Sequence, residues 1–320
     1  MKEKFAIGID VGGSSLKCGV VSTAGTIVHT FLHPLNNATT EDAIIEAIIA
    51  AIKQCADAAG GAVSGVGIGF PGIVDENVVI GGADNLPGFE NLPLGKIVQQ
   101  QTGYTVVMDN DANMMGVGEW AYGAAKGCTD IVFLTVGTGI GGALVLRNEL
   151  YGGYKNRGTE LGHIVLQQGG VPCCCGGRGC FEAYASVTAL INDYKALKND
   201  PDTTIDGKKI VEAYLQKDPS ALSAMNRHFE YMATGIAGFI NVFSPQKVII
   251  GGGISEAGDF YIEEIATRVK RIAMPAAAEY TTLSAAALGN KAGLLGCAAT
   301  VFRHTAGSSS GPVQATSVSK

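Results

Sequence analysis

Little in the sequence suggests a membrane protein or a nucleic-acid binder. The chain has 320 residues and contains no run of 18 apolar residues, so no transmembrane helix is expected. Only 16% of the residues are charged, acidic residues outnumber basic ones by 29 to 23, and no basic stripe is visible. Binding to nucleic acids through phosphate contacts requires such basic surface. We therefore expect neither a membrane nor a nucleic acid among the partners.

Two further absences narrow the possibilities. The opening residues, MKEKFAIGID, carry three charges ahead of Asp10 and leave no room for the apolar region of a signal peptide. No GxxxxGK[ST] motif occurs, which excludes a P-loop nucleotide site. We therefore expect a cytoplasmic protein that does not belong to the P-loop enzymes.

Apolar side chains and glycine are abundant. Hydrophobic residues make up 47% of the chain, enough for a large buried core, and the length favours two lobes. The 45 glycines are about twice the average usage and follow no Gly-X-Y period. We expect them in turns, or where the backbone approaches a ligand closely.

The order of predicted elements suggests an internal duplication. An apolar strand, a glycine-rich turn and a second strand occur at 5–10 and 16–21, and again at 131–136 and 143–147. This layout predicts one hairpin in each lobe. Residues 41–59 show the isoleucine spacing of an amphipathic helix. Further helices are expected over 183–197, 208–216, 221–243, 259–272 and 291–303.

The first candidate site is the turn after Asp10. Glycine allows backbone N–H groups to approach an anion, and the hydroxyl groups add donors. Asp10, at the end of a buried strand, has the oxygen ligands that Mg²⁺ prefers. The alternative is an ordinary hairpin turn with a solvated aspartate. The candidate residues are Asp10, Gly12, Gly13, Ser14, Ser15 and Lys17.

A second glycine turn resembles the dinucleotide-binding pattern GxGxxG at Gly137, Gly139 and Gly142. That pattern requires a helix to begin inside it, whereas the following residues read as a strand. We therefore predict a phosphate-cradling hairpin instead.

A carboxylate surrounded by amides follows the apolar segment TVVMD. Asp111 lies between Asn110 and Asn113, which suits a general base with hydrogen bonds to a polyol substrate. Asp and Asn also cap helices routinely, so an Asx-rich cap is an alternative. Asp109 is a competing carboxylate.

A cluster of cysteines predicts a zinc site. His163, with thiolates from Cys173 to Cys175 and from Cys180, can form a closed tetrahedral site of the structural kind. Alternate side chains of an extended segment point the same way, which favours Cys173 and Cys175 over Cys174. Free surface thiols are the alternative. The flanking acids Glu160 and Glu182 can accept sugar hydroxyl groups, or can be ordinary exposed glutamates.

Several motifs in order resemble the ROK family of bacterial sugar kinases and related repressors. They are DVGGSSLK at 10–17, NDAN at 110–113, LTVGTGIGGALV at 134–145, GTELGH at 158–163, CCCGGRGCFE at 173–182 and GGGIS at 251–255. The resemblance extends over about residues 5–303. Phe89 stands where the family often has Trp, so the sugar preference can differ.

This resemblance implies an α/β fold of the two-lobed actin-like (ribonuclease H-like) ATPase class. Mixed sheets with helices on their faces would form the lobes, with the ligand cleft between them. Residues 1–115 would form the small lobe, completed by a helix at about 291–305. Residues 116–290 would form the large lobe with the zinc loop, and 306–320 a disordered tail.

The resemblance also implies an ATP-dependent hexose 6-kinase, with glucose as the expected sugar and N-acetylmannosamine, N-acetylglucosamine or fructose as alternatives. A non-catalytic sugar-sensing regulator is the alternative from another class. ATP, Mg²⁺ and structural Zn²⁺ are the implied cofactors, and a homodimer is the implied assembly. Asp111 would be the general base. The implied sugar contacts are Asn85, Asn110, Glu160, His163 and Glu182. The implied ATP contacts are the Asp10 turn, Gly137, Thr138, Gly139, Gly251, Gly252 and Gly253. The implied zinc ligands are His163, Cys173, Cys175 and Cys180.

Overall fold

A computed structural model describes residues 3–35, 40–59, 62–83, 86, 88–199 and 204–307. Contacts between residues divide the chain into two units. Unit 1 contains the residues up to Gly118 together with those from Ala292 onward, and unit 2 runs from Glu119 to Lys291. The chain therefore passes from one unit to the other twice.

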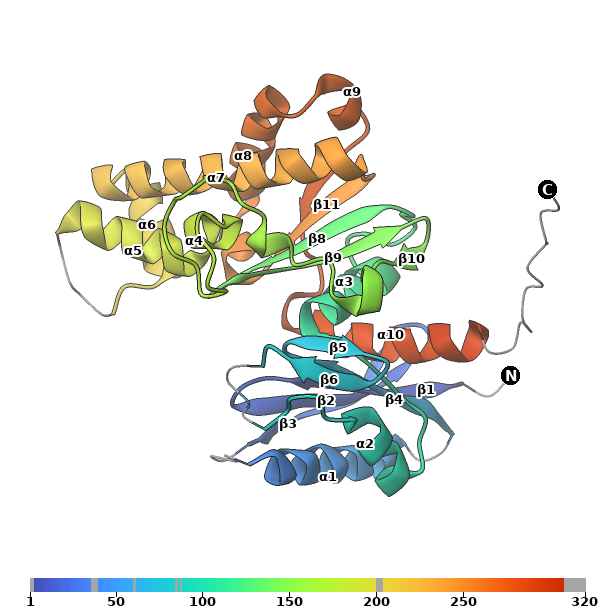
Figure 1. Cartoon of the computed structure of the whole chain (residues 1–320). Coiled ribbons are helices and arrows are strands. Elements are labelled where there is room, and N and C mark those ends of the chain that lie inside the picture. The colour runs from blue at the N-terminus through green and yellow to red at the C-terminus, as the bar shows by residue number, and fades with distance from the viewer. Residues whose placement is uncertain are drawn as a thin grey trace, which may run out of the picture. The chain divides into compact units, whose positions relative to one another are not determined.

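Unit 1 is built on a mixed five-stranded sheet (Figure 1). In spatial order its strands are β3 (Ile27–Pro34), β2 (Ser15–Ser22), β1 (Phe5–Val11), β4 (Val63–Phe70) and β7 (Val106–Asn110). β1, β2 and β3 form an antiparallel meander, whereas β1, β4 and β7 are parallel. A small hairpin of β5 (Ile73–Asp75) and β6 (Val78–Gly81) follows β4.

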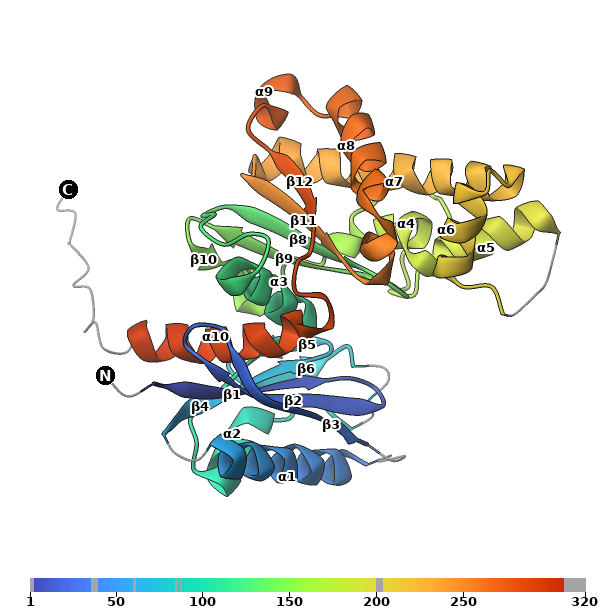
Figure 2. The ribbon, with the colours of Figure 1, turned by 180° about the vertical axis from the view of Figure 1, so that it is seen from behind.

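Helices cover both faces of this sheet (Figures 1 and 2). α1 (Glu41–Ala59) and α2 (Leu94–Thr102) lie on one face, and α10 (Ala292–Gly307) lies on the other. α1 has the predicted bounds. Its first turn is capped by the Thr40 hydroxyl, which accepts the N–H of Ala43 at 3.3 Å. The buried face of α1 is a row of isoleucines that includes Ile44, Ile48 and Ile52.

Glycines allow α10 to lie close to its neighbours. A Cβ atom on Gly67 of β4 would be 2.0 Å from the carbonyl oxygen of Cys297 in α10. A Cβ atom on Gly296 would be 1.7 Å from the carbonyl oxygen of Met114 in α3 (Asp111–Tyr122). The abundance of glycine therefore serves helix packing as well as the predicted turns and ligand approach.

Unit 2 repeats the same plan (Figure 2). Its sheet has the order β10 (Glu149–Leu150), β9 (Ile140–Leu146), β8 (Ile131–Val136), β11 (Lys247–Gly251) and β12 (Thr282–Ala285). β8 and β9 form an antiparallel hairpin, and β11 and β12 run parallel to β8. The predicted duplication of strand, glycine turn and strand is thereby confirmed.

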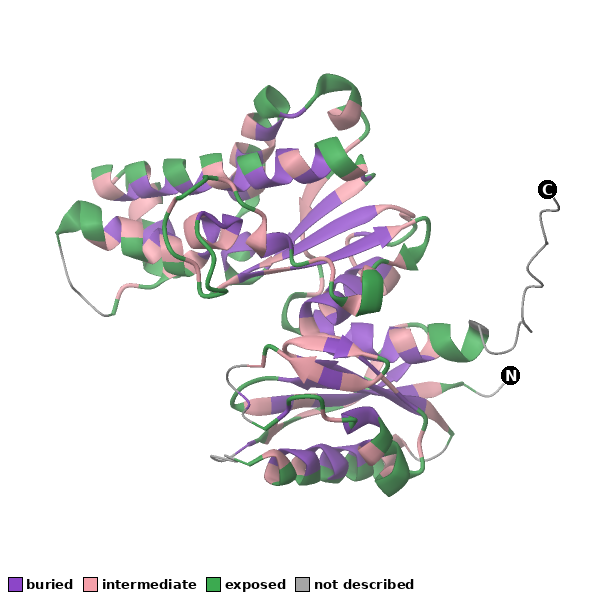
Figure 3. Ribbon diagram, viewed as in Figure 1, coloured by how far each residue is buried: buried purple, intermediate pink, exposed green. Residues whose placement is uncertain are grey.

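Helices form most of the rest of unit 2, and their buried faces join the sheet in one hydrophobic core (Figure 3). They are α4 (Phe181–Ala185), α5 (Val187–Lys198), α6 (Gly207–Leu215), α7 (Pro219–Phe243), α8 (Asp259–Ile272) and α9 (Pro275–Ala278). Short 3-10 turns, η1 to η4, occur at Tyr154–Asn156, Leu161–His163, Gly253–Ala257 and Gly289–Lys291.

Two sequence expectations differ from the structure. The single helix expected over 183–197 is two helices, because Ser186 takes an extended conformation between them and caps α5, accepting the Ala189 N–H at 3.1 Å. The strand expected from 143 begins at Ile140, inside the glycine motif. In the described part of the chain, no helix is both long and apolar enough to cross a membrane.

Candidate active site

The turn between β1 and β2 presents polar groups at the end of a buried strand. Gly12, Gly13 and Ser14 are exposed, and the Gly12 N–H donates to the carbonyl oxygen of Ser15 at 3.0 Å. Asp10 and Lys17 are partners across the hairpin, and Lys17 Nζ lies 3.3 Å from Asp10 Oδ2. The turn can therefore offer backbone N–H groups to an anion, with the ion pair at its base.

Asp10 is a buried carboxylate, 6% exposed. Burial raises the pKa of its carboxyl group, and the Lys17 ammonium group acts in the opposite direction. The first turn of α10 adjoins the carboxylate through Gly293. The N-terminal end of a helix stabilises a negative charge, so α10 also offsets the cost of burying Asp10.

The end of β7 and the start of α3 carry the NDAN motif. Asn110 Oδ1 accepts the N–H groups of Ala112 at 2.9 Å and Asn113 at 3.2 Å, and Asn110 Nδ2 donates to the Gly72 carbonyl oxygen at 2.9 Å. Asn110 is thus the cap of α3. The capping interpretation and a functional role for the next residue are compatible, because the cap holds Asp111 at the helix start.

The two candidate carboxylates of this motif differ in their contacts. Asp109 Oδ1 accepts the N–H of Asn110 at 2.7 Å and Asn113 Nδ2 at 2.8 Å. Asp111 is half-buried in the first turn of α3, and its Oδ1 accepts the Ala112 N–H at 2.8 Å. Asp109 therefore holds the backbone of the motif, and Asp111 is the better candidate for chemistry.

The strand register brings Asp10 and the NDAN motif to the same edge of the unit 1 sheet. Asp10 is paired with Gly69 of β4, and Gly69 is paired with Asp109 of β7. These strands are parallel, so their carboxyl ends coincide. Two strand spacings separate β1 from β7, which is about 10 Å. Asp10 and Asp111, distant in sequence, thus belong to one polar edge.

In unit 2 the four predicted zinc ligands come together. The ligand atoms of His163, Cys173, Cys175 and Cys180 all lie within 4.8 Å of one another. His163 ends η2, Cys180 precedes α4, and the other two come from the loop between them. Cys174, the middle residue of the CCC run, points to a different partner.

The distances in this cluster fit a zinc ion. Cys175 Sγ is 3.7 Å from Cys180 Sγ, and Cys173 Sγ is 3.6 Å from His163 Nδ1. In a tetrahedral site with Zn–S bonds of about 2.3 Å, two sulfurs are about 3.8 Å apart, and a sulfur and a nitrogen about 3.6 Å. These two distances match a tetrahedral zinc site, so the residues present are suited to hold zinc.

Glu182, in the first turn of α4, links the cysteine loop to the second glycine turn. Its Oε2 accepts the Ile140 N–H at 2.7 Å, and its Oε1 accepts the thiol of Cys174 at 3.0 Å. A Cβ atom on Gly139 would be 2.3 Å from Glu182 Oε2. The carboxylate is therefore held against the turn. Glu160, by contrast, is exposed and precedes η2, where its carbonyl oxygen accepts the His163 N–H.

The turn between β8 and β9 is held from two sides. Its Gly137 N–H donates to the Gly139 carbonyl oxygen at 2.9 Å. The start of α5 binds the same turn, because the Thr188 hydroxyl donates to the Thr138 carbonyl oxygen at 2.8 Å. A Cβ atom on Gly252 would be 2.1 Å from the Val136 carbonyl oxygen, so the GGG segment lies directly beside β8.

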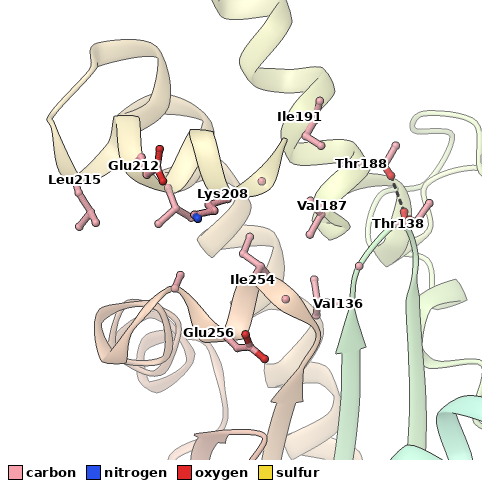
Figure 4. Close-up of a pocket in the computed structure, with 15 residues that line it drawn as sticks. Val136, Thr138, Val187, Thr188, Ile191, Lys208, Glu212, Leu215, Ile254 and Glu256 are labelled. Carbon is pink, nitrogen blue, oxygen red and sulfur yellow. Dashed lines mark hydrogen bonds between the residues drawn. The ribbon is translucent and has the colours of Figure 1, made fainter. Parts of the chain in front are cut away.

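A cavity of about 710 Å³ opens beside this turn, entirely within unit 2 (Figure 4). Its walls come from the 136–138 segment, α5, α6 and η3, as Figure 4 shows. Val136, Val187 and Ile254 give it apolar surface, and Lys208 and Glu212 add charged groups. A cavity of this size, with an apolar wall and a few charged groups, is typical of a small-molecule binding site.

The sequence motifs identified part of the candidate site, but several residues that contribute to it were not predicted. Glu256 and the α6 residues of the cavity carry no motif, and Gly293 and Ile140 act through backbone atoms. Gly293 is one of 45 glycines, and the α6 residues share their helical pattern with many other positions, so neither stands out in the sequence. Asn85, an expected sugar contact, lies outside the described residues, as does most of the 306–320 tail.

Known proteins resemble this chain over nearly its whole length. A model of the ROK family matches residues 6–304. The glucokinase of Thermotoga maritima is 36% identical over 314 residues, which cover 94% of this chain and 98% of that protein.

Solved structures resemble it as well. The ROK hexokinase from Thermus thermophilus superimposes with a TM-score of 0.85 at 31% identity, covering 95% of this chain and 99% of that one. The ROK glucokinase from Streptomyces griseus, solved in complex with glucose and AMPPNP, has a TM-score of 0.78 at 34% identity, covering 93% and 99%. The predicted α/β fold of the actin-like ATPase class is confirmed by this likeness.

Proposed function

The chain belongs to the ROK family, and on that premise we propose that it is an ATP-dependent hexose kinase that transfers the γ-phosphoryl group to a sugar, with glucose as the expected substrate. The observation that carries the proposal is the polar edge of unit 1. There Asp10 and Asp111 are placed at the carboxyl ends of parallel strands. Likeness to the two glucokinases supports the choice of glucose.

Asp111 is the proposed general base. A sugar hydroxyl group is a weak nucleophile at neutral pH, and a carboxylate that accepts its proton during attack is typically worth about 10²–10⁴-fold in rate. The cap formed by Asn110 holds Asp111 at the first position of α3. The helix N-terminus favours the ionised carboxylate, which is the form that accepts a proton.

Asp10 is the proposed carboxylate for Mg²⁺. The ion, when bound with ATP, would neutralise charge on the transferring phosphoryl group. Asp10 is buried and held by Lys17 and α10, so its oxygens keep one position. Phosphoryl transfer depends mainly on positioning and charge stabilisation, and a fixed carboxylate serves both.

We assign the nucleotide to the cavity of unit 2 and the two glycine turns. The apolar wall formed by Val136, Val187 and Ile254 suits the adenine ring. The proposed phosphate contacts are the backbone groups of Gly12 to Ser15 and of Gly137 to Gly139, and the proposed ribose-side contacts are Gly251 to Gly253.

For the sugar, we propose contacts from Asn85, Asn110, Glu160, His163 and Glu182. The Nδ1 atom of His163 belongs to the metal cluster, so its Nε2 is left for a sugar hydroxyl group. Asn110 uses its carbonyl oxygen and one amide hydrogen within the protein, and its second amide hydrogen can be donated to a sugar oxygen. The zinc ion would fix His163 and the start of α4, which carries Glu182.

The proposal is tested by measuring ADP release from ATP and Mg²⁺ with a panel of hexoses. The panel contains glucose, mannose, fructose, allose, N-acetylglucosamine and N-acetylmannosamine, with Asp111→Asn as the matched control. Turnover with glucose that disappears in Asp111→Asn is the expected result. Turnover with another sugar would change the assigned substrate and leave the assignment as a kinase intact. Sugar binding without any turnover would favour a sugar-sensing regulator.

Two remaining expectations belong to this proposal. A homodimer is supported by the family resemblance alone, and light scattering on the purified protein tests it. The cysteines proposed to bind zinc must remain reduced, and thiols persist in a reducing compartment. This supports a cytoplasmic location.

A further inference from the structure

A second group of metal-binding side chains adjoins the predicted zinc cluster. Glu182 Oε1 lies 3.0 Å from Cys174 Sγ and 3.9 Å from Cys173 Sγ. The ligand atoms of these three residues all lie within 4.8 Å of one another. Cys173 is common to this group and to the first, and the other two residues belong to the second group alone.

The donor set favours a thiophilic divalent cation. Cysteine thiolates select zinc and related soft ions, and a carboxylate completes many zinc sites. A thiolate sulfur has more than one lone pair, so Cys173 can bridge two cations. Three protein ligands leave one position of a tetrahedron for water, which makes this an open site that exchanges its ion more readily than a closed one.

The surroundings allow such a site to fill. Cys174 is exposed, so an ion can reach it from solvent. Glu182 is anchored through its other oxygen, because Oε2 accepts the Ile140 N–H at 2.7 Å. Oε1 therefore already faces the two sulfurs and needs no new rotamer to bind an ion. Binding would displace the thiol proton of Cys174 from its hydrogen bond with Oε1.

We propose that Cys174, Glu182 and a bridging Cys173 form a second, exchangeable binding site for zinc beside the closed zinc site. This inference rests on the proposed function in one respect, since Glu182 is the expected sugar contact. An ion on Oε1 would take that carboxylate oxygen from the sugar. Filling the second site would therefore compete with sugar binding, and the enzyme would be inhibited by excess zinc.

The binding test counts zinc in the holoprotein. Wild-type protein, Cys174→Ser and Cys128→Ser are dialysed against buffered free zinc, and bound zinc per chain is measured by elemental mass spectrometry. Cys128 lies outside both groups and controls for the loss of one thiol. Wild type and Cys128→Ser are expected to approach two zinc ions per chain, and Cys174→Ser one. Equal zinc content in wild type and Cys174→Ser would overturn the proposal.

The functional test measures sugar kinetics at fixed Mg·ATP with buffered zinc. Competition at the sugar site raises KM and leaves kcat unchanged. The rise in KM should be about elevenfold when free zinc is ten times the dissociation constant of the second site. Cys174→Ser, compared with its own KM without added zinc, is expected to lose this rise. A fall in kcat at constant KM would contradict competition through Glu182. The zinc count does not depend on turnover, so failure of the metal site and failure of the kinase assignment are distinguishable.

Discussion

Gly293 lies against the carboxylate of Asp10: a Cβ atom on Gly293 would be 2.9 Å from Asp10 Oδ2. This distance is shorter than ordinary van der Waals contact, so a side chain at position 293 has to move either the carboxylate or the first turn of α10. The proposed magnesium carboxylate, near the start of the chain, is thus positioned by a helix near its end.

Replacement of Gly293 by alanine is expected to impair catalysis. The methyl group would displace the Asp10 carboxylate, and small misplacements of catalytic groups cost roughly tenfold to a hundredfold in rate. Steady-state kinetics should show a fall in kcat of at least about tenfold. Gly238→Ala on α7 is the control, because its Cβ would meet no atom within 4 Å. Normal turnover in Gly293→Ala would remove the argument that Asp10 requires this position.

Replacement of Asp111 by asparagine is expected to abolish most turnover while sugar still binds. The amide cannot accept the hydroxyl proton, so kcat should fall by about 10²–10⁴-fold. Calorimetry with glucose should give a dissociation constant close to that of the wild type. Asp109→Ala, which removes the carboxylate oxygen that accepts the Asn110 N–H and Asn113 Nδ2, should instead reduce stability. A kcat within a few fold of the wild type in Asp111→Asn would eliminate this residue as the base.

Tightly bound zinc is expected at one ion per chain after gel filtration. Removal by a chelator should lower the thermal midpoint, because the free energy of metal binding contributes to the stability of the loop. Cys180→Ser should lose the ion in the same way, since Cys180 is a buried member of the closed cluster. Elemental analysis and thermal melts provide both readouts. Protein that is free of zinc yet melts at the same temperature would contradict the structural role.

Glu119, the first residue of unit 2, is expected to contribute to the stability of the protein. It is fully buried, and its Oε2 accepts the N–H of Ala124 at 2.8 Å while its Oε1 accepts that of Leu288 at 2.8 Å. In Glu119→Gln one side of the amide becomes a donor, so at least one of these N–H groups loses its acceptor. This change should lower the free energy of unfolding by about 2–3 kcal/mol in urea titrations.

Glu230→Gln is the matched control for Glu119. Glu230 pairs with Arg268 on the surface, and 54% of its side chain is exposed. Exposed ion pairs contribute about 0–1 kcal/mol to stability. The control should therefore change the free energy of unfolding by less than about 1 kcal/mol. Equal losses in the two variants would show that the buried hydrogen bonds of Glu119 are not decisive.

Stability is expected to fall at acidic pH because of His228. Burial lowers the pKa of this histidine from 6.5 to about 4, and its Nε2 lies 2.7 Å from the Tyr261 hydroxyl. The unfolded chain therefore binds more protons than the folded one between these two values. The contribution of His228 to stability is complete above pH 6.5 and decreases by up to about 1.4 kcal/mol per unit as the pH falls toward 4.

His228→Gln tests this dependence, since glutamine can keep the hydrogen bond to Tyr261 but does not titrate. Urea unfolding at pH 7 and pH 5 should show a larger loss in the wild type than in the variant. Parallel losses would mean that other groups cause the acid sensitivity.

Elements with a strong local pattern were predicted accurately. α1 and α8 have the expected bounds, 41–59 and 259–272, and so does the strand at 131–136. β3 was not predicted, because it is an outer strand of the sheet whose residues are half-buried and exposed in alternation. α2 and the β5–β6 hairpin are short, and their apolar residues acquire their role only in contact with α1 and β7.

In the candidate site, too, the features with a local sequence pattern were predicted and those formed by tertiary contacts were not. The cysteine loop, the glycine turns and the NDAN motif are each contiguous in sequence, so their chemistry could be inferred from residue type and spacing. Other contacts join residues that are separate in sequence or that compete for the same partner. They are the hydrogen bond of Glu182 with Ile140, the contact of Gly293 with Asp10 and the second group around Cys174. Such contacts depend on where whole helices and strands pack.

The sequence by itself determined the duplicated layout, the family and the identity of the chemical groups, because these follow from patterns within about ten consecutive residues. Only the tertiary structure decided which carboxylate holds the backbone and which can act, which thiols share a cluster, and which helix supports Asp10. Those choices depend on register and on contacts shorter than 4 Å between distant segments, which arise only when each sheet has packed with its own helices.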